Sequence, residues 1–260
     1  MWNIKEEDLG KFKITCRNRL SPEGATGFMI GTIIFVSLMM FFLIGTLVTF
    51  GWDYYTTFFE KTIVKIEIVL YGLQVIFLIL YSFPKARFKF QKLQTLVVLL
   101  YAFQLGTIGC TLFALPGMSD YSINFTTPIY VGLLVLGAVI VHIVTTVDTF
   151  KQASEGAFSM EEQSASFFSK TKGNVMRGAV IYVLILLVLI YVNNRYSLDI
   201  MFGYFIFTFV MYTVAIGAAE FQLLAYCRFK FPSFNITWEQ HQREIQRYRK
   251  KHKKNKSKSR

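Results

Sequence analysis

The amino-acid sequence predicts an all-α integral membrane protein, built as a bundle of about six transmembrane helices. Of its 260 residues, 53% are apolar and 17% are aromatic. The mean hydropathy is +0.42, which is higher than is usual for a water-soluble domain. The apolar residues gather in long runs, and the Lys and Arg residues are concentrated in alternate connections between those runs. Together these three observations indicate a polytopic membrane protein.

Six apolar runs are long enough to be membrane spans, because a helix that crosses about 30 Å of hydrocarbon needs about 20 mostly apolar residues. The expected spans cover residues 26–50, 62–83, 93–115, 128–148, 175–193 and 200–226. They divide the chain into a basic leader (1–25), a transmembrane domain (26–226) and a basic tail (227–260).

The orientation of the bundle is predicted by its positive charges, because short cytoplasmic connections keep Lys and Arg whereas short translocated connections lack them. All 28 Lys and Arg residues except Lys61, Lys65 and Arg195 lie in the leader, the second connection, the fourth connection or the tail. We therefore expect both termini to be cytoplasmic and the protein to reside in the plasma membrane.

The tail carries most of the formal net charge of +12. We expect a charged helix over residues 238–250 and disorder in the last ten residues, which are almost free of apolar side chains. A polybasic segment beside a membrane helix attracts anionic lipid head groups, so we expect lipid rather than nucleic acid as its partner. In the connection 149–174, Ser159 and Glu162 have capping-box spacing, which predicts a short interfacial helix.

The chain lacks the sequence signs of an enzyme or a metal protein. Cys16, Cys110 and Cys227 belong to three separate predicted elements, which suits neither a disulfide framework nor a metal site. No phosphate-binding glycine loop, metalloprotease motif or serine-hydrolase motif is present. We therefore expect a non-catalytic protein without a cofactor or a metal.

Small residues at four-residue intervals form stripes on two of the predicted helices. Their members are Gly27 and Gly31 on the first helix, and Ala102, Gly106, Cys110 and Ala114 on the third. Such a stripe lets a neighbouring helix approach closely. We expect both stripes to serve packing inside the bundle, with a homodimer contact as the alternative.

Two ionisable residues, His142 and Glu220, lie well inside predicted spans, where ionisable groups are candidates for function by default. Each is six residues from the cytoplasmic end of its span, so a rise of about 1.5 Å per residue places both about 9 Å deep. We expect them to meet as an intramembrane polar pair. The pair is either a proton-sensitive element of a pathway or a static hydrogen bond between helices. The static bond is favoured because such bonds are common, and Glu220 could instead reach Arg228 or Lys230.

Three further polar residues lie in the predicted second and third spans. Gln74 and Gln104 fall near mid-membrane and are expected to bond to each other. Glu67 falls near the outer end of its span. We expect Glu67 to pair with Lys65 or Lys61 at the membrane interface rather than to bind a substrate.

The sequence leaves two functions open. The favoured one is a non-catalytic multi-pass membrane protein that acts by contact with a membrane-protein partner or a second copy. It would be an accessory component of a secretion-type membrane assembly, or an immunity factor against a membrane-active toxin. The alternative is the permease subunit of a transporter, such as an ATP-driven export pump, with His142 and Glu220 on the pathway.

Overall fold

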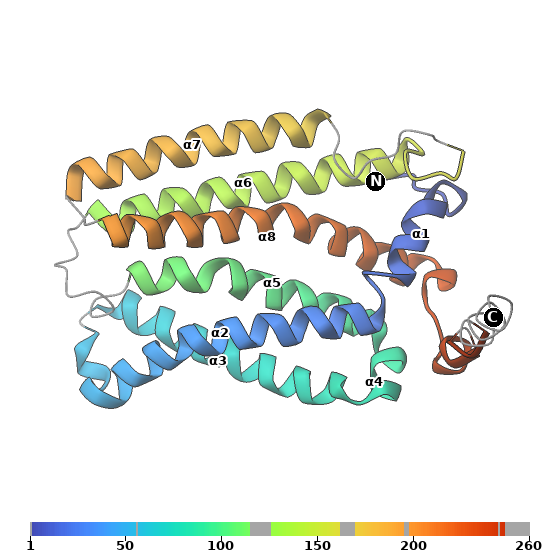
Figure 1. Cartoon of the computed structure of the whole chain (residues 1–260), viewed down its shortest axis with the longest axis horizontal. Helices are drawn as coiled ribbons and strands as arrows, with labels where there is room; N and C mark the ends of the chain where they lie inside the picture. Colours follow the sequence, from blue (N-terminus) through green and yellow to red (C-terminus); the bar gives the residue numbers. More distant parts are fainter. Residues whose placement is uncertain are drawn as a thin grey trace, which may run out of the picture.

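The structure is a computed structural model that describes residues 2–55, 57–114, 126–161, 170–194, 198–243 and 245–247. Within these ranges the regular structure is entirely helical. Six helices are long and apolar enough to cross a membrane. They are α2 (Pro22–Phe50), α3 (Phe58–Ser82), α5 (Gln91–Ala114), α6 (Thr126–Ser154), α7 (Lys170–Asn194) and α8 (Leu198–Lys230). They run side by side along the long axis of the molecule (Figure 1).

The observed helices extend beyond the predicted spans at several ends, because a helix continues until its backbone is capped and not only while its side chains are apolar. The helix α2 begins at Pro22, where the preceding Ser21 hydroxyl accepts a hydrogen bond from the Gly24 amide at 3.1 Å. It ends at Gly51, whose φ of +74° suits glycine. A capping box of Thr57 and Glu60 then starts α3.

The leader is folded in the structure rather than being only a charged extension. It contains the 3-10 turn η1 (Glu7–Leu9) and the helix α1 (Gly10–Arg17). Leu9, Phe12 and Cys16 are buried in a cluster with Ala153 of α6 and Leu223 of α8. The leader therefore covers one end of the bundle.

The segment that follows α8 folds onto the same end. It contains the 3-10 turn η3 (Pro232–Phe234) and helical residues 238–243 and 245–247, within the predicted charged helix. The Ser233 hydroxyl donates a hydrogen bond to the Glu6 carboxylate, and Lys13 donates to the Ser233 hydroxyl at 2.6 Å. We call residues 2–21 and the described residues from 231 to 247 the terminal cap, and the end of the bundle that carries it the cap end. The predicted disorder of the last ten residues lies outside the described residues.

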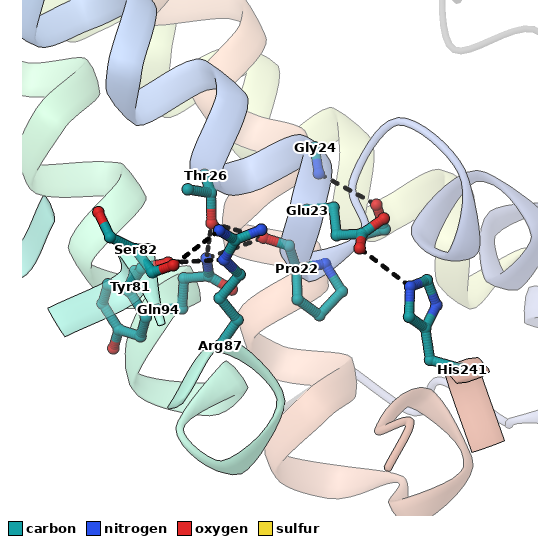
Figure 2. A network of polar contacts seen from close by, with 10 residues as sticks. Pro22, Glu23, Gly24, Thr26, Tyr81, Ser82, Arg87, Gln94 and His241 are labelled. Carbon is teal, nitrogen blue, oxygen red and sulfur yellow. Dashed lines mark hydrogen bonds and ion pairs between the residues drawn. The ribbon is translucent and has the colours of Figure 1, made fainter. Parts of the chain in front are cut away.

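Polar contacts fasten the helix ends beneath the terminal cap (Figure 2). Arg87, from the short helix α4 (Pro84–Lys89), donates to the backbone carbonyls of Tyr81 and Ser82 at 2.6 and 3.0 Å. Gln94 of α5 donates to the Thr26 hydroxyl of α2 at 2.9 Å. The two Arg87 bonds use carbonyls that the end of α3 would otherwise leave without a partner and join α4 to α3, whereas the Gln94 bond joins α5 to α2.

At the far end of the bundle, the 3-10 turn η2 (Trp52–Tyr54) joins α2 to α3. The predicted interfacial helix in the connection 149–174 falls partly on residues 162–169, outside the described residues. Ser159 lies in a bend after α6, and Gly156 before it has a φ of +76°. The described part of that connection is therefore a turn.

The helix α8 lies at the centre of the arrangement. It packs along α5 on one side and along α6 on the other, while α5 and α6 touch each other only sparsely. A buried cluster joins these helices to α7, with Cys110, Leu134, Leu186 and Met211 among its members. Because α5 and α6 stay apart in front of α8, a hollow remains between the three helices.

Candidate functional site

The hollow between α5, α6 and α8 is a cavity of about 270 Å³, which we call the seam cavity. Its walls are almost wholly apolar, with Val135 and Val139 on α6 and Val214 on α8. The polar side chains that line it are Thr107, His142 and Gln222. An apolar hollow with few polar groups is the usual form of a small-ligand site, so this is the strongest candidate site in the part of the chain that the structure describes.

The stripe on α5 shapes the floor of the seam cavity. Ala102 and Gly106 line it, and a Cβ placed on Gly106 would lie 3.6 Å from Val214 of α8. One turn further, Gly109 meets Phe207 so closely that its Cβ would lie 2.1 Å from the phenyl ring. These small residues let α5 approach α8. Cys110 is buried in the core cluster, and the side chain of Ala114 lies outside the described residues.

The stripe on α2 has a different environment. A Cβ placed on Gly27 or Gly31 would meet no atom of the described chain within 4 Å. Both glycines are exposed, so this stripe does not pack against another described helix. The expectation of packing inside the bundle therefore does not describe the first helix.

His142 is held by two neighbours on α8. Its Nδ1 lies 2.8 Å from the Ala215 carbonyl oxygen, and its Nε2 lies 2.9 Å from Nε2 of Gln222. A carbonyl oxygen only accepts, so Nδ1 carries the proton and donates, and Nε2 accepts from the Gln222 amide. These partners suit a neutral imidazole that links α6 to α8 at the edge of the seam cavity.

Glu220 has different partners from His142, and the predicted pair does not form. The Glu220 carboxylate is buried and accepts a hydrogen bond from the guanidinium of Arg19 in the leader. Lys172 of α7 is also buried and lies close enough to attract both Glu220 and Asp148 of α6. Glu220 is thus part of a charge network at the cap end.

The helical phase of α8 explains why the predicted pair is absent. Depth along the axis is similar for His142 and Glu220, but successive residues of a helix turn by about 100°. Gln222, two positions after Glu220, therefore points to the opposite side of α8 and takes the place beside His142. The sequence shows Gln222 as a second polar residue that could meet His142. Only the packing of α6 against α8 identifies which face of α8 does so.

A second polar cluster lies nearer the far end, between α3 and α5. The Gln104 amide donates to the Glu67 carboxylate at 2.8 Å, and the Thr111 hydroxyl donates to it at 3.1 Å. The expected pairing of Glu67 with Lys65 or Lys61 is wrong, since the carboxylate is bonded to α5 instead, and Lys65 lies over the Trp52 ring, 5.6 Å from its centroid. A helix-to-helix bond satisfies the buried carboxylate better than a lysine whose charge remains in the polar region.

The expected bond between Gln74 and Gln104 is also wrong. The Gln104 amide is committed to Glu67, and the buried Gln74 amide has no hydrogen-bond partner among the described residues. The Tyr101 hydroxyl, which lies nearby on α5, donates to the backbone carbonyl of Gln74. Tyr101 therefore links α3 to α5 where the two glutamines were expected to do so.

The described residues contain no group of three or more His, Cys, Asp or Glu side chains that could hold a metal ion. The fold and these sites belong to an all-helical chain with six helices able to cross a membrane. No protein family, curated protein or solved structure matches this chain. Its function must therefore be inferred from its own geometry.

Proposed function

We propose that the chain lies in the plasma membrane with both termini cytoplasmic, and acts as a non-catalytic membrane protein by contact with a partner. The positive charges in the leader, the second and fourth connections and the tail support this orientation. The partner is a membrane protein of a secretion-type assembly that this chain assists, or a membrane-active toxin against which it gives immunity.

The outward stripe on α2 is the observation that carries the proposal. Gly27 and Gly31 face away from the other described helices, and Ile30, Ile34 and Leu38 continue the same exposed face. Glycines four residues apart let a second helix approach the backbone closely, which favours association between membrane helices. We infer that this face receives a transmembrane helix of the partner.

The polar groups within the helices support contact rather than transport. His142 is bonded to α8, Glu67 is bonded to α5, and Glu220 is bonded to the leader. Each of these side chains is bonded to a different neighbouring segment, and the three lie at different places in the bundle. A transport pathway needs polar groups that converge on one route instead.

The basic tail is proposed to strengthen membrane attachment. The segment after α8 continues into a run rich in Lys and Arg. Each such residue near an anionic leaflet contributes about 1 kcal/mol. Anionic lipid head groups, and not nucleic acid, are the partners that this placement favours.

Photo-crosslinking in native membranes tests the contact proposal. A photoreactive residue at Ile34, whose side chain is 67% exposed, is compared with one at Ile76 on α3, which is 61% exposed. We expect a discrete protein adduct at position 34, none at position 76, and loss of the adduct on Gly31→Ile because the larger side chain separates the helices. An adduct of twice the chain mass would identify a second copy as the partner. Lipid adducts alone at position 34, or the same protein adduct at position 76, would refute the proposal.

The permease subunit remains a second candidate because of the seam cavity, where His142 and Gln222 meet an apolar hollow. Glu220 does not line that cavity, so the pathway of this alternative would use His142 without Glu220. Complementation of the phenotype of a deletion strain separates the two functions. Contact predicts that Gly31→Ile fails to complement and that the double variant His142→Leu, Gln222→Met succeeds. Transport predicts the reverse, with equal protein levels as the control.

A further inference from the structure

A second cleft opens at the cap end, away from the seam cavity. It has a volume of about 520 Å³ and lies between the start of α5, the end of α8 and the segment that follows α8. Lys89 and Lys92 lie on its polar side, and Leu93, Leu96 and Phe229 line its apolar side. The cleft thus combines positive charge with an apolar wall.

The two lysines are not engaged by acidic side chains of the described chain. Lys92 Nζ lies 5.5 Å from the centroid of Phe229, and Lys89 Nζ lies 5.4 Å from that of Phe90. Among the described residues no carboxylate lines this cleft. Glu239 lines the adjacent cavity, which Lys85 and Lys89 also line, and Lys85 attracts it. The cleft therefore presents a positive potential that suits an anionic ligand.

The two neighbouring arginines have other roles. Arg87 donates to helix-end carbonyls of α3 (Figure 2), and Arg228 is buried and donates to the Gln91 carbonyl. Each is bound to backbone oxygens, which leaves Lys89 and Lys92 as the cations that face the cleft. A phosphate group would be the natural counter-ion for two lysines on one rim.

The apolar wall indicates what the phosphate belongs to. Leu93, Leu96 and Phe229 are all exposed and lie on helices that are apolar enough to cross a membrane. Leu93 and Leu96 continue from the lysines along α5 toward the middle of the bundle, which is the direction an acyl chain takes below a head group, and Phe229 in the last turn of α8 lies beside Lys92. A free phosphate ion has no apolar group that could contact this wall.

The cleft is preformed by hydrogen bonds between its walls. The Gln91 amide donates to the Ile236 carbonyl at 3.1 Å, and the Ile236 amide donates to the Gln91 side-chain oxygen at 3.2 Å. The Asn235 amide donates to the Arg228 carbonyl at 2.9 Å.

We propose that this cleft binds an anionic phospholipid, with its phosphate at Lys89 and Lys92 and one acyl chain along Leu93, Leu96 and Phe229. The inference rests on the membrane placement proposed above and is independent of the contact face on α2. It assigns lipid recognition to the start of α5, separately from the basic tail.

Lipid binding by the full-length chain in nanodiscs tests the site. Native mass spectrometry counts retained lipid in phosphatidylglycerol against phosphatidylcholine, for wild type and for Lys89→Gln/Lys92→Gln. We expect wild type to retain phosphatidylglycerol selectively and the double variant to lose at least tenfold in affinity. Lys61→Gln/Lys65→Gln at the far end and a chain that stops after Arg247 should both stay within twofold of wild type. The Lys89→Arg/Lys92→Arg variant should retain binding, since the charge is kept.

Each contrary result would overturn the proposal. Unchanged affinity of Lys89→Gln/Lys92→Gln would show that the two lysines do not hold the head group. Loss of binding on truncation would assign recognition to the tail. Competition by inorganic phosphate at equal concentration would show an anion site without acyl-chain recognition. The thermal midpoint of the glutamine variant in phosphatidylcholine, expected to equal that of wild type, shows that a loss of binding is not a loss of fold.

Discussion

Replacing Arg228 with methionine should release the leader from the bundle. The Arg228 side chain is 1% exposed and donates to the Gln91 carbonyl at 2.9 Å, the Thr95 hydroxyl at 2.6 Å and the Leu20 carbonyl at 3.2 Å. A hydrogen bond from a charged donor contributes about 1.5–3 kcal/mol. Removing the cation also removes its cost of burial, which offsets part of this loss. Only the bond to the Leu20 carbonyl joins Arg228 to the leader, so we expect Arg228→Met to lower the free energy of opening the leader by about 1.5 kcal/mol.

Two native cysteines report this opening. Cys16 of α1 is buried between the leader and the bundle, and burial, together with the neighbouring Cys227, raises the pKa of its thiol. Its reaction with a maleimide therefore requires the leader to open. Cys110 lies in the core cluster beside Met211 and reports opening of the bundle itself. A loss of about 1.5 kcal/mol raises the open population about tenfold.

Site-resolved labelling of the purified chain, followed by peptide mass spectrometry, measures both rates. We expect Cys16 in Arg228→Met to label about tenfold faster than in wild type, with a smaller change in the Cys110 rate. Lys151→Met is the matched control, since it removes only an exposed ion pair to Glu155, a change of about 0.5 kcal/mol or less. A Cys16 rate within about threefold of wild type, or an equal rise at Cys110, would refute the reasoning.

Gly109→Val should destabilise the fold by about 1–3 kcal/mol through overpacking, because its Cβ would lie 2.1 Å from the Phe207 ring; its thermal midpoint should fall well below that of Gly72→Val, whose Cβ meets no described atom within 4 Å. Glu67→Leu should cost about 1–3 kcal/mol, since it leaves the Gln104 amide and the Thr111 hydroxyl without their acceptor. Glu67→Gln keeps an acceptor oxygen and should cost less, so equal midpoints for these two variants would contradict the assignment. The Ser233 hydroxyl, and then Lys13, lower the pKa of Glu6 below its ordinary value. The ionised Glu6 therefore stabilises the terminal cap fully at any pH above the ordinary glutamate pKa. This stabilisation is lost as the pH falls through the lowered pKa of the folded state. Hydrogen exchange of residues 4–9, corrected for the intrinsic rate, should therefore accelerate on acidification in wild type and show no such step in Glu6→Gln.

The six long helices could be predicted because each carries an apolar run of sufficient length, a property that sequence displays directly. Their ends could not be placed as well, since the Ser21 cap and the turns of α6 and α8 beyond the apolar runs depend on local bonding rather than on hydropathy. The folding of the leader into a helix was not predicted from the sequence, although the spacing of Leu9, Phe12 and Cys16 places them along one side of a short helix.

For the candidate site, the sequence predicted the heights of His142 and Glu220 along their helices, but not the directions in which their side chains point. A rise of about 1.5 Å per residue gives the height of His142 and Glu220 from the sequence alone. The side of α8 on which Glu220 emerges becomes known only when the neighbours of α8 are placed. The same reason explains the Glu67 error, because charge attraction favoured Lys65 whereas helix packing brings Gln104 and Thr111 to the carboxylate.

The contact of the leader with the end of α8 has a consequence for biosynthesis. The surface that buries Leu9 and Phe12 includes Leu223, Cys227 and Phe234, which are translated in or after α8, the last of the six long helices. The leader is translated long before α8, so part of its apolar surface stays uncovered until α8 and the segment after it are in place. A product truncated before α8 would therefore keep an exposed apolar surface on the leader that quality-control proteases can recognise.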